Sequence, residues 1–331
     1  MDRLKSILVA VDFSPCSADA FKQAARIAAW DSGAGRSLAA LHVVALPTYV
    51  PTPHPFIPFD LPMQADLVPE AKQHWARFAL DCKAKATVAL DIQIGSPREQ
   101  ILERVRRDKP DLLVLGSHSV LDAQKSIGPT AAALVQRAET TVLLVREGHA
   151  GPFKTVVACI DFTDTSRLAL EQAVRVAVED DAMLHILNVY EDPWYGLGPP
   201  DAINSTMPDF KARYKRAIED RLREFCAPLA HEIKAPKAVF HGLESKWRGG
   251  GYGHAIVAFV KGEGCDLAVL GTRAKWNLRD FFWGTTAERV VREARCSILA
   301  IKPARPEGIE QAEPTPSESS TKDPGTARPS F

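Results

Sequence analysis

Leu112-Leu113-Val114-Leu115-Gly116 and Leu267-Ala268-Val269-Leu270-Gly271 are two apolar runs that each end in a glycine. A second glycine follows each run, at Gly128 and at Gly284, and a short helical pattern and a final apolar run close each unit. A buried strand that leads into a glycine loop and then into a helix N-terminus can hold a phosphate group. Because this arrangement occurs twice, the sequence predicts a duplicated nucleotide-binding domain.

The start of each unit repeats as well. Residues 8–14 read Leu-Val-Ala-Val-Asp-Phe-Ser, and residues 157–163 read Val-Ala-Cys-Ile-Asp-Phe-Thr. The two copies of each motif are separated by nearly the same number of residues, which indicates duplication with small insertions. Strands that are apolar on both faces alternate with helical patterns, as is typical of a parallel sheet covered by helices. The fold class predicted is therefore α/β, with two tandem, doubly wound, five-stranded parallel-sheet domains.

We place the first domain at 1–146, a linker at 147–153 and the second domain at 154–303. A disordered C-terminal tail is expected at 304–331, because that stretch is rich in Glu, Pro, Ser and Thr and has almost no large apolar residue. A strand of the second domain is predicted at 237–240.

Composition excludes several classes of protein. Lysine plus arginine equals aspartate plus glutamate, 41 against 41, so nothing favours a nucleic acid or an anionic membrane as a direct partner. The six cysteines are scattered without a Cys-x-x-Cys pair, as in reduced cytosolic proteins. The first residues lack the apolar region typical of a signal peptide, and no apolar run approaches the length expected of a membrane span, so we expect neither feature. The chain is predicted to be cytoplasmic.

Asp12 and Asp161 end the first strand of each copy, while Gly116 and Gly271 end the fourth. In a doubly wound sheet, ligands bind beyond the carboxyl ends of the strands. We expect a buried aspartate there to accept hydrogen bonds from an adenine amino group or a ribose hydroxyl. The alternative is that the aspartate helps to cap the following helix, and the sequence leaves both open.

These motifs together resemble the universal stress protein family. The resemblance rests on Asp-Phe-Ser/Thr after the first strand, on Leu-His-Val or Leu-Asn-Val in the second, and on Gly-Thr-Thr-Ala-Glu-Arg-Val-Val at 284–291. It covers roughly residues 4–145 and 154–302. It implies a sheet of the adenine nucleotide alpha hydrolase-like type in each copy.

ATP-binding members of this family have a loop G-x-x-G-x9-G-[S/T]. The second copy keeps the spacing and the terminal Gly284-Thr285, but Ala274 replaces the second glycine. The first copy departs further, because Ser119 replaces that glycine, only eight residues separate it from Gly128, and Pro129 occupies the Ser/Thr position. The resemblance therefore implies that the second copy is the better site and that the first is degenerate.

By resemblance, Asp161 and the main chain around Val189 would hold adenine, and the glycine loop would hold ribose and phosphates. The ligand would be ATP or AMP, with Mg²⁺ as a candidate companion ion. The loop residues of the second copy are Gly271, Arg273, Ala274, Gly284, Thr285 and Thr286. Their first-copy counterparts, together with those of the adenine contacts, are Asp12, Val43, Gly116, Gly128 and Thr130. The alternative is that the loops only connect sheet to helix.

The resemblance further implies a non-catalytic role in stress survival, through ligand-gated association with stress-response proteins. Two other functions stay open. One is a nucleotide-free scaffold or carrier in which Pro47–Pro62 and the Trp194-Tyr195 loop cover an apolar ligand; the other is a slow ATPase using Asp280 or Glu288. The closing strands at 141–145 and 297–301 are apolar edges, so we expect them to pair and form an internal pseudo-dimer. The sequence leaves a further homodimer open.

Overall fold

The computed structural model describes residues 5–30, 36–45, 64–83, 88–119, 127–191, 209–233, 238–245, 251–272 and 285–303. The expected tail and the two loops suggested to cover an apolar ligand lie outside these residues. Among the described helices, none is long and apolar enough to cross a membrane.

The two copies have the same order of elements. In the first copy, residues 5–146, these are β1 (Ser6–Val11), α1 (Pro15–Ala29), β2 (Ser37–Val44), α2 (Gln64–Asp81), β3 (Ala89–Ile94), α3 (Pro97–Asp108), β4 (Leu112–Gly116), α4 (Pro129–Arg137) and β5 (Thr141–Val145). In the second copy, residues 154–303, they are β6 (Thr155–Cys159), α5 (Asp164–Asp180), β7 (Met183–Tyr190), α7 (Phe210–Cys226), the short η2 (Ala227–Leu229) and α8 (Ala230–Ile233), β8 (Ala238–Glu244), α9 (Tyr252–Gly262), β9 (Leu267–Gly271), α10 (Thr285–Glu293) and β10 (Ser297–Ile301).

The two five-stranded halves join into one ten-stranded sheet. Its order is β3-β2-β1-β4-β5-β10-β9-β6-β7-β8, and every pair inside a half is parallel. The closing strands β5 and β10 pair antiparallel, with Leu143 opposite Leu299. The α/β fold is confirmed, and each half supplies the partner for the apolar edge strand of the other half.

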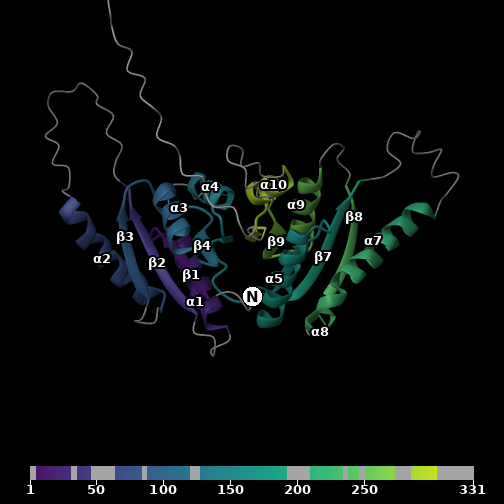
Figure 1. Ribbon diagram of the computed structural model, residues 1–331, viewed down its shortest axis with the longest axis horizontal. Helices are drawn as coiled ribbons and strands as arrows, with labels where there is room; N and C mark the ends of the chain where they lie inside the picture. Colours follow the sequence, from purple (N-terminus) through teal and green to yellow (C-terminus); the bar gives the residue numbers. More distant parts are fainter. Residues whose placement is uncertain are drawn as a thin grey trace, which may run out of the picture.

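Helices cover both faces of this sheet. Figure 1 shows α3, α4, α9 and α10 on one side and α1 and α5 on the other. Alternate residues of β1 feed two separate cores, with Val9 in the core under α1 and α5 and Leu8 in the core under α3, α4, α9 and α10. This alternation follows from the two-residue period of a strand, and it explains why the strands are apolar on both faces.

Further contacts hold the two copies together. The backbone N–H of Gly148 donates to Asp19 over 2.7 Å, and Gln23 Nε2 donates to the carbonyls of His149 and Gly151 over 2.6 Å each. Lys302, just after β10, donates from Nζ to the carbonyl of Val135 near the end of α4 over 2.7 Å. The segment between the copies is therefore bonded to helix α1, and Lys302 of the second copy caps the end of α4 in the first copy.

Candidate functional site

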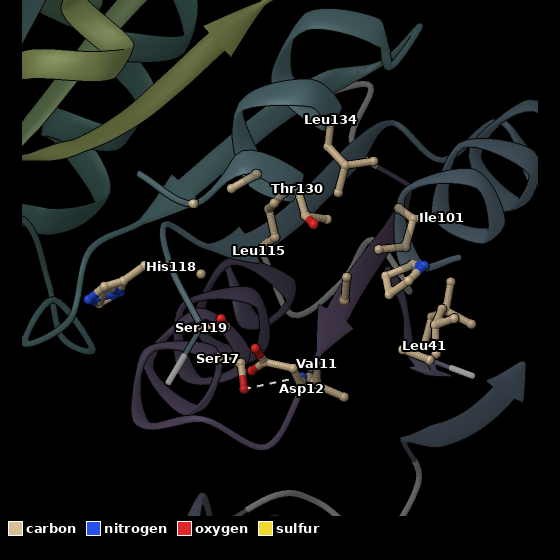
Figure 2. A pocket seen from close by; sticks show the side chains of 17 residues that line it. Val11, Asp12, Ser17, Leu41, Ile101, Leu115, His118, Ser119, Thr130 and Leu134 are labelled. Atoms are coloured by element: carbon tan, nitrogen blue, oxygen red, sulfur yellow. Dashed lines mark hydrogen bonds between the residues drawn. The ribbon is translucent and has the colours of Figure 1, made fainter. Parts of the chain in front are cut away.

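Each copy has a crevice at the carboxyl ends of its strands, on the face covered by α3 and α4 or by α9 and α10. The first crevice has a volume of about 330 Å³ (Figure 2). The second crevice is larger, at about 500 Å³. All five predicted site residues of the first copy line the first crevice: Asp12, Val43, Gly116, Gly128 and Thr130. The described predicted residues of the second copy line the second crevice: Asp161, Val189, Gly271, Thr285 and Thr286. Arg273, Ala274, Asp280 and Gly284 lie outside the described residues.

The two aspartates organise the turn after the first strand. Asp12 Oδ1 accepts from the N–H of Ser14 over 3.0 Å, and Asp161 Oδ1 accepts from the N–H of Thr163 over 3.1 Å. Ser14 and Thr163 are themselves the N-caps of α1 and α5. The expectation of a buried aspartate is wrong, because both side chains are exposed at the rim of the crevice. The aspartates support the caps through Oδ1, and both side chains line their crevices.

A strained residue follows each aspartate. Phe13 has φ of 62° and Phe162 has φ of 63°, in the left-handed region that bulky residues avoid. Aromatic packing holds both rings: Phe13 lies 4.3 Å from the His42 ring centroid, and Phe162 lies 5.6 Å from that of Phe225. Sequence reasoning missed this strain. Its one signal was the recurrence of Phe after Asp in both copies.

Gly116 and Gly271 have a packing role that the sequence did not reveal. A Cβ on Gly271 would lie 2.9 Å from Cγ2 of Thr165, and a Cβ on Gly116 would lie 3.1 Å from the carbonyl carbon of Cys16. The first turn of α5 or α1 therefore approaches the end of β9 or β4 so closely that only glycine fits. These two glycines are required by the fold alone, so the case for a phosphate site depends on other groups.

The helices that border the crevices begin differently in the two copies. In the first copy, α3 begins at Pro97 and α4 at Pro129. In the second copy, α9 begins at Tyr252 and α10 at Thr285. Proline lacks a backbone N–H, whereas the residues of the second copy supply an N–H and a hydroxyl at each helix start. The second crevice is therefore richer in hydrogen-bond donors.

The main chain of Val189 faces the second crevice. The carbonyl of Leu187 accepts from the N–H of Ile160, on the β6 side of β7, and the carbonyl of Tyr190 accepts from Ser245 on the β8 side. Backbone groups alternate in direction along a strand, so those of Val189 are directed to the same side as those of Leu187. Strand β6 has already ended at Cys159. Val189 thus presents a donor and an acceptor at the end of the sheet.

Asn188 is a lining residue that the site prediction left out. Its side-chain Nδ2 donates to the carbonyl of Ile160 over 2.8 Å, and in the first copy His42 Nδ1 lies 2.8 Å from the carbonyl of Val11. Burial lowers the pKa of His42, which favours the neutral ring. The two residues occupy the middle of the Leu-Asn-Val and Leu-His-Val motifs, so a signal for this position was present.

Tyr252 is a second lining residue that the prediction missed. It is the first residue of α9 and lines the crevice together with Ile256. Burial, and then the nearby Glu191 charge, raises the pKa of Tyr252.

Of the two carboxylates suggested for an ATPase, Asp280 lies outside the described residues, and Glu288 is not placed at the second crevice. Glu288 pairs with Arg292 over 2.9 Å along α10, and it is not among the residues that line the crevice. No cluster of three or more His, Cys, Asp or Glu side chains suited to a metal occurs within the described ranges. Cys16, the thiol closest to the first glycine loop, has its pKa raised by burial, which disfavours a thiolate nucleophile.

Known proteins match both the sequence and the fold. The model of the Universal stress protein family matches residues 3–146 and again residues 152–302. The chain therefore belongs to the universal stress protein family and carries its domain in tandem. Universal stress protein A homolog 1 of Coxiella burnetii is 26% identical over 149 residues, which are 45% of this chain and 96% of the relative.

Another relative, Universal stress protein MJ0531 of Methanocaldococcus jannaschii, is 25% identical over 168 residues, covering 50% of this chain and 90% of its own. A solved universal stress protein from Archaeoglobus fulgidus has the same fold across both copies. It covers 91% of this chain and 99% of its own, with a TM-score of 0.59 and 16% identity.

Proposed function

We propose that this protein serves in the stress response by binding an adenine nucleotide, ATP or AMP, in the second crevice. Ligand binding would then govern association with partner proteins, without chemical turnover. The observation that carries the proposal is the set of hydrogen-bonding groups around this crevice of about 500 Å³. A cytoplasmic location stays a prediction from cysteine usage, and Mg²⁺ is a candidate companion of the phosphates.

Each part of a nucleotide has a complementary group in this crevice. The N–H groups in the first turn of α10, at Thr285 and Thr286, have no partner within the helix, and the helix dipole adds positive potential for phosphate. The donor and acceptor of Val189 suit the edge of a base. The exposed carboxylate of Asp161 suits ribose hydroxyls, which donate to it.

The first crevice is the internal comparison. It has the equivalent aspartate and valine, yet Pro97 and Pro129 begin its bordering helices, and its wall includes the apolar side chains of Leu41, Ile101 and Leu134 (Figure 2). We expect it to leave nucleotide unbound. Because this crevice offers fewer polar groups than the second one, the uncharged-ligand alternative is favoured for this copy.

Isothermal titration with ATP and AMP, after native mass spectrometry of the purified protein, tests the proposal. One nucleotide should bind per chain. Thr285→Pro, which installs the first-copy residue, removes an N–H and a hydroxyl that suit a charged phosphate, so we expect affinity to fall about 10- to 100-fold. Proline is well tolerated at a helix start, so the fold should persist. Glu179→Gln on α5, outside the crevice, is the matched control. Unchanged affinity in Thr285→Pro, or absence of binding in the parent, contradicts the proposal.

The gating step has its own readout. Hydrogen exchange across 272–293 should slow when nucleotide saturates the protein, because the ligand would bond to the first turn of α10. Exchange in β5 should not change. If saturating nucleotide changes hydrogen exchange in neither segment, the ligand does not alter the surface offered to partners, and the gating proposal is contradicted.

A further inference from the structure

Buried apolar side chains form the walls of the first crevice. Leu41 comes from β2, Ile101 from α3 and Leu134 from α4, and all three are buried and belong to one core cluster. Figure 2 shows Ile101, Leu115 and Leu134 around the same space. An opening of about 330 Å³ therefore lies directly against the apolar core of the first copy.

The carboxylate of Asp12 stands at one end of this crevice, where β1 ends. The N–H of Asp12 is hydrogen bonded to Ser17 Oγ over 3.4 Å (Figure 2). A carboxylate offers about four acceptor positions, and the N–H of Ser14 occupies one of those on Asp12. Asp12 therefore retains the capacity to accept a hydroxyl proton from a ligand.

The first crevice is poorly suited to an anion. Among its described lining residues there is no lysine or arginine. Nε2 of His118 lies 3.4 Å from the carboxylate of Glu147, and Figure 2 shows the His118 ring directed away from the other labelled side chains. Helix α4 begins with Pro129, which lacks an N–H. A phosphate or carboxylate would thus meet the charge of Asp12 without a cation to offset it.

The volume of the crevice indicates the size of its ligand. Apolar cavities of about 150 Å³ stay dry and take up a single ring such as benzene. Small-molecule sites begin at about 300 Å³ and are lined mostly by apolar side chains, with a few polar groups that orient the ligand. The first crevice, at about 330 Å³, has room for roughly two such rings.

We propose that the first crevice binds a small uncharged molecule that has an apolar body of about two rings and a hydroxyl group donating to Asp12. This inference goes beyond the proposed function, because it assigns a different kind of ligand to a different site.

The second crevice differs at positions that contact such a ligand. Leu134 and Val290 are the sixth residues of α4 and α10, and of the two only Leu134 is among the described residues that line the crevices. Pro97 begins α3, whereas Tyr252, with its hydroxyl, begins α9. The apolar surface is therefore more extensive in the first copy, and an apolar ligand should prefer it.

Isothermal titration with 2-naphthol and with 2-naphthoate tests the inference. Both probes have the same fused rings, but 2-naphthol is uncharged and donates from its hydroxyl, whereas 2-naphthoate is an anion. One 2-naphthol should bind per chain, at least about tenfold more tightly than 2-naphthoate, because the anion would face Asp12 without a cation. Saturating ATP should leave the affinity for 2-naphthol unchanged, since ATP is expected in the other crevice.

Two variants and a control locate the probe. Asp12→Asn keeps an acceptor for the N–H of Ser14 but removes the charge, so the preference for 2-naphthol should shrink to about threefold or less. Thr130→Trp, at an exposed position of α4 that lines the crevice, should weaken 2-naphthol binding at least about tenfold by filling the space. Glu179→Gln, on α5 and outside the crevice, should alter neither value.

The outcomes decide this inference independently of the proposed function. Absence of 2-naphthol binding, or equal affinity for 2-naphthoate, overturns it. Displacement of 2-naphthol by ATP also overturns it, as does a change of 2-naphthol binding in Asp161→Asn but not in Asp12→Asn, because both would place the probe in the second crevice. If Asp12→Asn loses its circular dichroism signal, Thr130→Trp decides the matter, and unaltered affinity in that variant overturns the inference. The titration with ATP decides the proposed function separately, so each proposal can fail while the other stands.

Discussion

Gly253 allows α9 and α10 to meet beside the second crevice. A Cβ at this position would lie 2.9 Å from Cβ of Arg289 and 3.1 Å from the carbonyl oxygen of Thr286. Neither atom is at the far end of a flexible side chain, so the helices themselves would have to separate. Gly262, the last residue of the same helix, has no atom within 4 Å of its would-be Cβ. The two glycines are a matched pair for one substitution.

The size of the effect follows from two opposed terms. Alanine gains up to about 1 kcal/mol over glycine within a helix, and less near its ends. Overpacking a tight contact costs about 1–3 kcal/mol. We therefore expect Gly253→Ala to lower the free energy of unfolding by about 1–2 kcal/mol, while Gly262→Ala leaves it unchanged or raises it slightly. Gly253→Ala should also weaken nucleotide binding, because Thr286 lies in the first turn of α10.

Urea unfolding followed by circular dichroism measures the first effect, and titration with ATP measures the second. Both variants replace glycine by alanine in the same helix, so the contribution of helix propensity largely cancels between them. The remaining difference in their free energies of unfolding reports the contact of Gly253 with α10. Equal stability of Gly253→Ala and Gly262→Ala would refute the reasoning, because it would mean that the helices can part at no cost.

Three further substitutions test the junction and the buried titratable groups. Leu299→Ala, in β10 where it faces β5, should lower the free energy of unfolding by about 2–5 kcal/mol in urea titrations, as large-to-small core changes do. Burial lowers the pKa of Lys302 from 10.5 to about 8. Because the folded state releases this proton first as pH rises, the free energy of unfolding should increase between pH 8 and 10.5, by up to about 3 kcal/mol. Lys302→Met should abolish this increase. His185 Nδ1 lies 2.9 Å from His241 Nε2, and burial lowers both pKa values. The melting temperature should therefore fall as pH drops below about 6.5, where the unfolded chain takes up protons. His241→Leu should make the melting temperature less dependent on pH in this range.

The sequence predicted most of the fold because its strands are buried on both faces. The runs at 141–145 and 297–301 become β5 and β10 with those bounds. The edge strand β8 was predicted to stop at 240, yet it continues through Gly242 to Glu244. A Cβ on Gly242 would lie 3.3 Å from Cγ2 of Ile218, so the glycine there serves the packing of α7 and does not end the strand.

The candidate site was harder to predict, because its groups come from distant parts of the chain. The repeated Asp and Gly residues were found, and they line the crevices, but their burial and their role were partly misjudged. Tyr252 was missed because a single Tyr carries no motif by itself, and Asn188 was missed although it lies in the repeated Leu-Asn-Val motif. Only the fold, which brings β7 and α9 together, gives such residues a shared position.

The difference between the copies has a physical rationale that does not require both to bind a ligand. Each copy ends in an apolar strand, and each needs the other to cover it, so the first copy contributes to stability whatever its crevice contains. Proline at a helix start removes a donor for a ligand, but its fixed φ is suited to the first turn of a helix. Pro97 and Pro129 therefore replace ligand-facing donors with residues that favour α3 and α4. In the second copy the same positions keep an N–H and a hydroxyl. The tandem arrangement thus allows one copy to be optimised as a partner strand and scaffold while the other retains the chemistry of a binding site.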